Sequence, residues 1–180
     1  THHINHFERT RKLITTQTRN RKRIGVIDIF AGPGGLGEGF SAYELQPGSG
    51  QYPFELAVSA EMEASAHATL RLRAFYRQLV RESGEVPDEY HEYLKAIVSG
   101  SSESPSGHFG AGRWKKQWKL AEHQALNLTL GEASHNQALF DRIDAAKRGC
   151  EELILIGGPP CQAYSLVGRA RNRNVEDFFL

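Results

Sequence analysis

Cys161 is the residue whose surroundings best suit covalent chemistry. It stands in Pro159-Pro160-Cys161-Gln162, directly after the apolar run 153–156, which predicts a buried strand. The two prolines form a rigid turn that fixes the direction of the thiol. A nearby Arg169 would raise the share of reactive thiolate. We interpret Cys161 as a nucleophile and Cys150 as a buried inert thiol; a disulfide between them is less favoured in a reducing compartment.

A glycine-rich loop supplies a second candidate site. Gly32-Pro33-Gly34-Gly35-Leu36-Gly37 follows the β-branched run 24–30 and matches the GxGxxG pattern of dinucleotide-binding loops. Two residues argue against a pyrophosphate, because Pro33 lacks an amide hydrogen and Asp28 places a carboxylate where a phosphate would lie. A cationic ligand such as S-adenosylmethionine fits better, with Glu61 holding its ribose hydroxyls. The alternatives are that Asp28 caps the loop and that Glu61 is a solvated strand end.

The elements that position these residues alternate along the chain. Apolar, β-branched runs predict strands over 24–30, 54–60, 126–130 and 153–156. Helices are expected after the glycine loop, over 64–80 and over 137–147. This alternation predicts an α/β fold with a mostly parallel sheet and with ligands at the carboxyl ends of its strands.

Three other stretches lie outside this pattern. Residues 1–23 are rich in arginine and lysine, and we interpret them as a mobile basic lead-in to a domain over 24–180. Glycine and serine dominate 100–112, so we expect a flexible insertion near 99–112 with no capacity to bury a core. Trp114 and Trp118 lie one helical turn apart with lysines between them, which favours helix packing over base stacking.

Composition limits the class of protein. The 180 residues carry 22 Lys+Arg and 21 Asp+Glu, so the net charge of +1 does not by itself indicate a nucleic-acid partner. The longest apolar run, 153–156, is far short of the roughly 20 residues that a membrane helix needs. Two cysteines without CxxC spacing indicate neither a disulfide scaffold nor a zinc site. We therefore expect a cytoplasmic protein that binds no membrane and no metal.

Together, the two candidate sites resemble two motifs of one enzyme family. Asp28-Ile29-Phe30-Ala31-Gly32-Pro33-Gly34-Gly35-Leu36 and Gly158-Pro159-Pro160-Cys161-Gln162-Ala163-Tyr164-Ser165-Leu166-Val167-Gly168-Arg169 are similar, in this order, to the first and fourth motifs of the DNA (cytosine-5) methyltransferases. The resemblance implies a Rossmann-like, S-adenosyl-L-methionine-dependent catalytic domain that acts on a cytosine flipped out of double-stranded DNA. A restriction endonuclease is the functional companion that it suggests.

The resemblance also implies roles for individual residues. Phe30 and Met62 would contact the adenine, and Glu61 the ribose. Glu132, after Gly131, stands where the family places an acid that holds the adenine amine. The other implied cofactor-binding residues are Asp28, Ala31, Gly32, Gly34, Gly35, Leu36 and Pro160. DNA contacts would come from Gln162, Ser165, Arg169, Arg171 and Arg173.

The implied reaction explains the need for a thiol. Carbon 5 of cytosine is a poor nucleophile, so Cys161 would attack carbon 6 and push electron density onto carbon 5, which takes the methyl group from the sulfonium. Elimination then frees the enzyme. The base must be flipped because the thiol cannot reach the ring inside the stack, and protein contacts must offset the cost of unstacking.

Other motifs of the family are missing from the sequence. We find no Glu-Asn-Val motif, arginine motif, target-recognition region or final cofactor-binding segment. We therefore expect the chain to be the N-terminal part of the catalytic domain and to be unable to methylate DNA alone. The alternatives are methylation of cytosine in tRNA, a cofactor-binding half that needs a partner chain, and an NAD-dependent oxidoreductase. Only the GxGxxG pattern supports the last of these.

Overall fold

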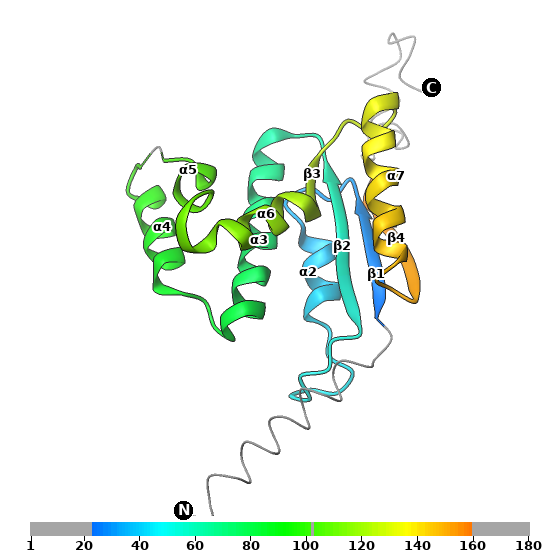
Figure 1. Cartoon of the computed structure of the whole chain (residues 1–180), viewed down its shortest axis with the longest axis horizontal. Coiled ribbons are helices and arrows are strands. Elements are labelled where there is room, and N and C mark those ends of the chain that lie inside the picture. Colours follow the sequence, from blue (N-terminus) through cyan, green and yellow to red (C-terminus); the bar gives the residue numbers. More distant parts are fainter. Residues whose placement is uncertain (1–22, 102, 160–180) are drawn as a thin grey trace, which may run out of the picture.

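The computed structural model describes residues 23–101 and 103–159, which form an α/β arrangement (Figure 1). The strands are β1 Ile24–Ile29, β2 Phe54–Glu61, β3 Ala125–Asn127 and β4 Glu152–Gly157. The helices are α2 Gly35–Ala42, α3 Ala64–Ser83, α4 Asp88–Val98, α5 Pro105–Phe109, α6 Lys115–Gln124 and α7 Ala133–Lys147, with a 3-10 turn η1 at Gly112–Trp114.

The four strands form one parallel sheet in the order β3-β2-β1-β4, which confirms the predicted fold class. β1 is central because it is apolar on both faces: the consecutive residues Val26 and Ile27 are both buried. It pairs with β2 along its length and with β4 up to the pair Ile29–Gly157. The strand order reverses between β1 and β4, and open parallel sheets bind ligands at the carboxyl ends of strands at such a point.

Helices cover both faces of the sheet. α7 lies on one face, and α2 and α3 lie on the other (Figure 1). On the α7 side, Ile27, Val58 and Leu139 belong to one apolar core. On the other side, α3, α4, α5 and α6 enclose an aromatic cluster in which the rings of Phe75 and Trp118 lie 5.3 Å apart. Removal of these side chains from water is the main force that holds the helices in place.

α3 is the longest of the described helices, and local signals set both of its ends. The carboxylate of Glu63 accepts hydrogen bonds from amides of the first turn, including that of Ser65 at 3.0 Å, and so forms an N-cap. At the other end Gly84 adopts a left-handed φ of 78°, and its amide donates to a carbonyl of the last turn. This helix confirms the prediction for 64–80.

The segment 100–112 differs from the sequence-based expectation. It contains α5, and its Phe109 side chain is 2% exposed, with a ring centroid 4.6 Å from that of Phe75. The prediction that this stretch has no capacity to bury a core is therefore wrong, because one aromatic residue anchors a segment of small residues. Trp114 and Trp118 are buried as well, which confirms the packing interpretation of that pair.

Smaller differences concern the other strands and α4. β3 covers three residues and begins earlier than the predicted strand over 126–130. β4 forms where predicted but is not buried, since Leu155 is 65% exposed and β4 pairs with β1 alone among the described strands. α4 was not predicted, and its buried residues are Tyr90 and Tyr93, one turn apart.

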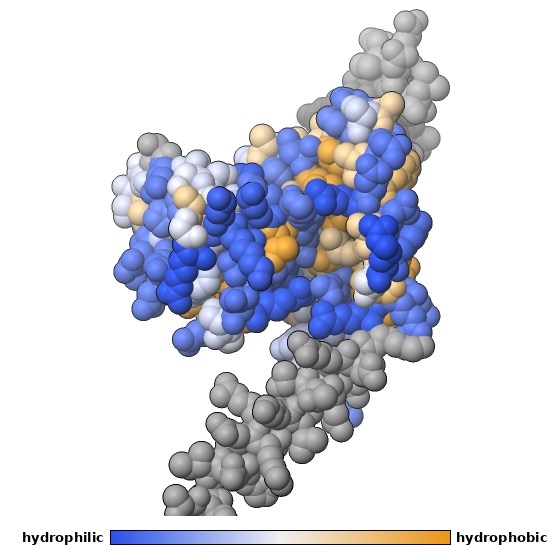
Figure 2. Space-filling model, viewed as in Figure 1, coloured by the Kyte–Doolittle hydropathy of each residue, from blue (hydrophilic) through white to orange (hydrophobic). Residues whose placement is uncertain are grey.

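The face of the molecule seen in Figures 1 and 2 has a mainly hydrophilic region and an apolar region. Hydrophilic residues cover most of the face over α4, α5 and α6, and apolar residues show in the hollow between α6 and α7 (Figure 2). Within the described residues, no helix is both long and apolar enough to cross a membrane.

Candidate functional site

The loop after β1 lies at the carboxyl edge of the sheet. The Ala31 amide donates to the carbonyl of Ala60 near the end of β2 at 3.0 Å, and the Gly34 amide donates to the carbonyl of Ala31 at 2.9 Å. Phe30 has a φ of 55°, in the left-handed region that non-glycine residues rarely adopt, and its side chain is partly exposed. The predicted loop residues therefore form one tight turn that presents the Phe30 ring to solvent.

Glu61 joins the ends of β1 and β2. Its Oε2 accepts a hydrogen bond from the Gly32 amide at 2.8 Å, and its Oε1 accepts one from the Glu63 amide at 2.7 Å. Each oxygen has a second lone pair, so the carboxylate can still accept hydrogen bonds from hydroxyl groups. The structure thus brings Glu61 and the glycine loop together, although they are 29 residues apart in sequence.

Asn127 belongs to this edge and was not singled out from the sequence. Its Nδ2 donates to the carbonyls of Glu61 and Met62 at 2.9 and 3.1 Å. The Leu128 amide also donates to the Glu61 carbonyl, at 3.1 Å. These bonds fix the backbone that follows β2 and therefore the position of the Glu61 carboxylate. The polar residue between two leucines at the end of a short strand is the sequence signal for this role.

Three apolar side chains stand exposed in the segments that flank this carboxylate. Phe30, Leu36 and Met62 are 37%, 50% and 64% exposed. A Cβ placed at Gly32 or at Gly35 would meet no atom of the described residues within 4 Å, so these residues leave the backbone of the loop open to a ligand there. A fixed carboxylate with exposed apolar groups nearby suits a ligand that carries a flat ring and hydroxyl groups.

Asp28 lies beneath the loop and not at the open edge. It is 1% exposed and pairs across the sheet with Ser59, which is also buried. Its Oδ2 lies 3.0 Å from the place of a Cβ on Gly37, in the first turn of α2. Burial raises the pKa of Asp28, and the nearby Gly37 amide offsets this in part, although its geometry falls short of a hydrogen bond to the carboxylate. This placement favours a role at the start of α2 over direct contact with a ligand.

The carboxyl end of β4 adjoins the glycine loop. Gly157 pairs with Ile29, and a Cβ placed at Gly157 would lie 2.4 Å from the Ile29 carbonyl oxygen. This close approach requires glycine, and the chain then leaves the sheet through Gly158 and Pro159 beside the start of the loop. The other predicted residues of this segment, Pro160, Cys161, Gln162, Ser165, Arg169, Arg171 and Arg173, lie outside the described residues.

Glu132 stands at the N-terminus of α7. Its side chain is exposed and does not cap the helix. One oxygen lies 3.3 Å from Nδ1 of His135, which accepts a hydrogen bond from the Thr129 amide at 2.9 Å. The carboxylate is exposed and can meet a ligand from solvent, but within the described residues no hydrogen bond or ion pair joins it to Glu61 or to the glycine loop.

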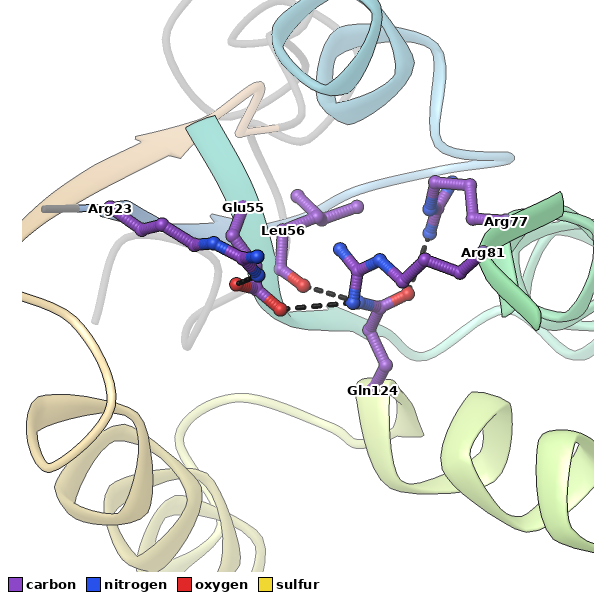
Figure 3. Close-up of polar contacts among 6 residues, drawn as sticks. All are labelled: Arg23, Glu55, Leu56, Arg77, Arg81 and Gln124. Carbon is purple, nitrogen blue, oxygen red and sulfur yellow. Dashed lines mark hydrogen bonds and ion pairs between the residues drawn. The ribbon is translucent and has the colours of Figure 1, made fainter. Parts of the chain in front are cut away.

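A cavity of about 940 Å³ lies at the opposite, amino-terminal edge of the sheet, between α2, α3 and the start of β2. There the guanidinium of Arg77 bonds with the carboxylate of Glu38 and donates to Gln124 Oε1 at 2.8 Å. The Gln124 amide in turn donates to the carbonyl of Leu56 (Figure 3). This chain of contacts ties α2, α3 and α6 to β2.

A second group in the same cavity centres on Glu55. Its carboxylate accepts from Arg23 at 2.6 Å and from Arg81 at 3.0 Å. Burial by itself would raise the pKa of Glu55, but the two arginines outweigh it and lower that pKa. The charged groups of the cavity are thus paired with one another, and no local sequence pattern predicts these pairs.

Two further observations concern a metal site and the thiol of Cys150. Among residues 23–101 and 103–159, no three His, Cys, Asp or Glu side chains group as a metal site. Burial raises the pKa of the Cys150 thiol, and Glu55 acts in the same direction, so the reactive thiolate is disfavoured there. Cys150 is partly and not fully buried, which differs from the prediction of a buried thiol, and its inertness stays a prediction.

Comparison with known proteins finds a similar enzyme. The chain is 32% identical over 159 residues to a type II methyltransferase from Bacillus paralicheniformis; the match covers 83% of this chain and 33% of the relative, so the chain spans about a third of that protein's length. No family model matches the chain, and no solved structure matches it. The open parallel sheet agrees with the Rossmann-like methyltransferase fold. The chain is therefore a member of the family to which this type II methyltransferase belongs.

Proposed function

We propose that the chain binds S-adenosylmethionine and supplies the nucleophile that enables methyl transfer to carbon 5 of cytosine in double-stranded DNA. The observation that carries this proposal is the register of β1 and β4, in which Gly157 lies beside Ile29. The segment that leads to Cys161 therefore starts next to the glycine loop. Similarity to a type II methyltransferase supports the reaction class, and a restriction endonuclease as functional companion belongs to the same proposal.

The open carboxyl edge fits S-adenosylmethionine better than a dinucleotide. The Gly32 amide is already bonded to the Glu61 carboxylate, and Pro33 has no amide hydrogen, so the loop has fewer free donors for a pyrophosphate. The same carboxylate can accept the two ribose hydroxyls, and the exposed rings and chains of Phe30 and Met62 offer apolar surface to adenine. We assign the remaining contacts to Ala31, Gly32, Gly34, Gly35, Leu36, Glu132 and Pro160.

When bound, S-adenosylmethionine supplies an electrophilic methyl group on a sulfonium. The thiolate of Cys161 forms a bond to carbon 6 of the cytosine, and the displaced electron pair makes carbon 5 nucleophilic toward that methyl group. Loss of the proton from carbon 5 then restores the ring double bond as the bond between sulfur and carbon 6 breaks. Pro159 and Pro160 restrict the backbone before the thiol and so help to hold its direction.

The DNA must present its cytosine outside the stack for this reaction. Unstacking costs a few kcal/mol, which contacts with the duplex must offset. We assign phosphate and base contacts to Gln162, Ser165, Arg169, Arg171 and Arg173. Because the chain matches about a third of its relative, we also propose that base-specific contacts come from regions outside that third and that this chain alone does not turn over.

Identification of the methylated product tests this function. A full-length protein that carries this sequence is incubated with methyl-labelled S-adenosylmethionine and either duplex DNA or tRNA. The expected product is 5-methylcytosine in the duplex, with no label in tRNA. Label on the exocyclic nitrogen of cytosine or adenine contradicts the cytosine-5 chemistry, and label confined to tRNA contradicts the DNA substrate.

A further inference from the structure

The exposed face of α6 is basic. Lys115, Lys116, Lys119 and His123 line a shallow depression together with Arg113 of η1. Positions 115, 116, 119, 120 and 123 span an arc of about 140° on a helix of 3.6 residues per turn. The opposite face of α6 is buried against α3 through residues such as Trp118 and Ala121. The helix therefore presents a continuous basic stripe to solvent.

Neighbouring carboxylates leave much of this charge unbalanced. Arg113 lies 4.0 Å from Glu89, a long contact between two exposed side chains. Glu122, the acidic residue of α6, accepts from Trp118 Nε1 and lies 3.8 Å from Arg71. Within the part of the chain that the structure describes, the three lysines of the stripe form no ion pair.

The position of these cations on the helix is unfavourable for folding. Lys115 and Lys116 occupy the first turn of α6, where the helix dipole is positive and where no acidic residue stands. α4 has the stabilising arrangement, with Asp88 and Glu89 in its first turn. The basic residues of α6 thus add to the positive potential of a helix end, which stabilises bound anions and not the free helix.

We infer that the stripe of Arg113, Lys115, Lys116, Lys119 and His123 binds the phosphate backbone of duplex DNA; this inference rests on the proposed function. The stripe extends about 12 Å along the helix. It is a row of four lysine and arginine cations that ends at His123, and not a pocket for one small anion. Duplex DNA carries one negative charge per about 1.7 Å of its axis, which such a row can neutralise. Phosphate contacts of this kind position the duplex without reading its sequence.

The stripe is also held rigidly relative to the candidate cofactor edge. α6 continues directly into β3, which pairs with β2 up to Glu61–Asn127. Asn127 then bonds to the backbone of Glu61 and Met62. A duplex held by α6 is therefore tied to the edge that carries Glu61 through one short strand.

Salt-dependent binding to duplex DNA tests the inference. The variant K115Q/K116Q/K119Q removes three cations from the stripe. The matched control K95Q/K147Q/R148Q removes three exposed cations, one from α4, one from the last turn of α7 and one from the residue that follows α7. Both retain the other basic stretches of the chain. We expect the first variant to weaken binding about tenfold at low salt and to reduce the slope of log affinity against log salt by about 2 to 3. We expect the control to change affinity less than about twofold.

Three results would overturn the inference. These are equal losses in the two variants, absence of duplex binding by the unaltered chain, and equally tight, competing binding of phosphatidylserine vesicles, which would assign the stripe to an anionic membrane. Titration with S-adenosylhomocysteine is run on each protein in parallel. If K115Q/K116Q/K119Q binds the cofactor normally and its affinity for the duplex is unchanged, the inference is rejected but the proposed function is not. If the unaltered chain does not bind the cofactor, the proposed function is rejected.

Discussion

The two edges of the sheet use their polar groups in opposite ways. At the amino edge, the cavity is large, but Arg77, Glu38, Arg23, Arg81 and Glu55 are paired with one another. At the carboxyl edge, apolar side chains are exposed and the Glu61 carboxylate retains free lone pairs. The comparison teaches that unused binding capacity, and not cavity volume, marks the candidate site. The charge pairs of the larger cavity are better explained as ties between helices and sheet.

The largest expected effect concerns the rate of methyl transfer and leaves cofactor affinity and stability unchanged. In a full-length protein that carries this sequence, Cys161→Ser should abolish methyl transfer, because a hydroxyl is a far weaker nucleophile than a thiolate. Affinity for S-adenosylhomocysteine and the melting temperature should stay close to those of the unaltered protein. Label transfer, calorimetry and thermal melting measure the three quantities. Loss of cofactor affinity together with activity would instead make Cys161 a structural residue.

At the amino edge, the expected effect is on stability. Arg77→Ala leaves the partly buried Glu38 carboxylate and the Gln124 amide without their partner, and we expect a loss of about 3 kcal/mol in the free energy of unfolding. Burial lowers the pKa of Arg77, as expected of a charge shielded from water. Arg81→Ala, one turn further along α3 and half exposed, is the control and should cost less than about 1 kcal/mol. Urea unfolding that ranks the two variants the other way contradicts this account of the cavity.

The contact between β4 and β1 predicts a third, smaller effect. Gly157→Ala forces a Cβ against the Ile29 carbonyl and should cost about 1 to 3 kcal/mol. Gly158→Ala is a close control, because a Cβ there meets no atom within 4 Å in the part of the chain that the structure describes, and it should change stability by less than about 0.5 kcal/mol. Denaturant unfolding compares the two. Equal stabilities would show that β4 does not require glycine at its junction with the loop.

The smallest predicted effect depends on pH. Because burial raises the pKa of Asp28, the folded state retains a proton that the unfolded state releases above about pH 3.9. This residue therefore costs stability as pH rises through that value and toward the raised pKa. Relative to the unaltered chain, Asp28→Asn should gain stability over that window and hold its gain at higher pH. A difference that shrinks as pH rises would mean that the folded state favours the carboxylate.

The sequence predicted those parts of the fold that depend on local patterns. β1 and β4 were found because apolar runs mark them, and α3 because apolar residues such as Leu70 and Ala74 lie opposite an arginine-rich face. α4 was missed because its buried residues, Tyr90 and Tyr93, sit among charged ones, and the anchoring role of Phe109 was hidden by surrounding small residues. A composition average cannot show that one aromatic side chain finds a pocket made by distant helices.

The candidate site also has some features that local sequence patterns predict and others that they do not. The tight turn at the glycine loop and the acid at the end of β2 are local features, so the sequence placed Glu61 near that loop. The burial of Asp28 under α2 and the bond from Asn127 to the Glu61 carbonyl depend on contacts between distant segments. The arginine network is of the same kind, since Arg77 and Glu38 are 39 residues apart. No spacing rule connects residues that meet only after the sheet has formed.

The most direct test is a calorimetric titration of this chain with S-adenosylhomocysteine, with NADH as the control ligand. Glu61→Ala alters the carboxyl edge, and Glu55→Ala, as a matched control, removes a glutamate from the amino-edge cavity. We expect saturable binding by the unaltered chain and by Glu55→Ala, binding weakened by about tenfold or more in Glu61→Ala, and no binding of NADH. Binding that survives Glu61→Ala but is lost in Glu55→Ala, or binding of NADH alone, would contradict the assignment of the cofactor to the carboxyl edge.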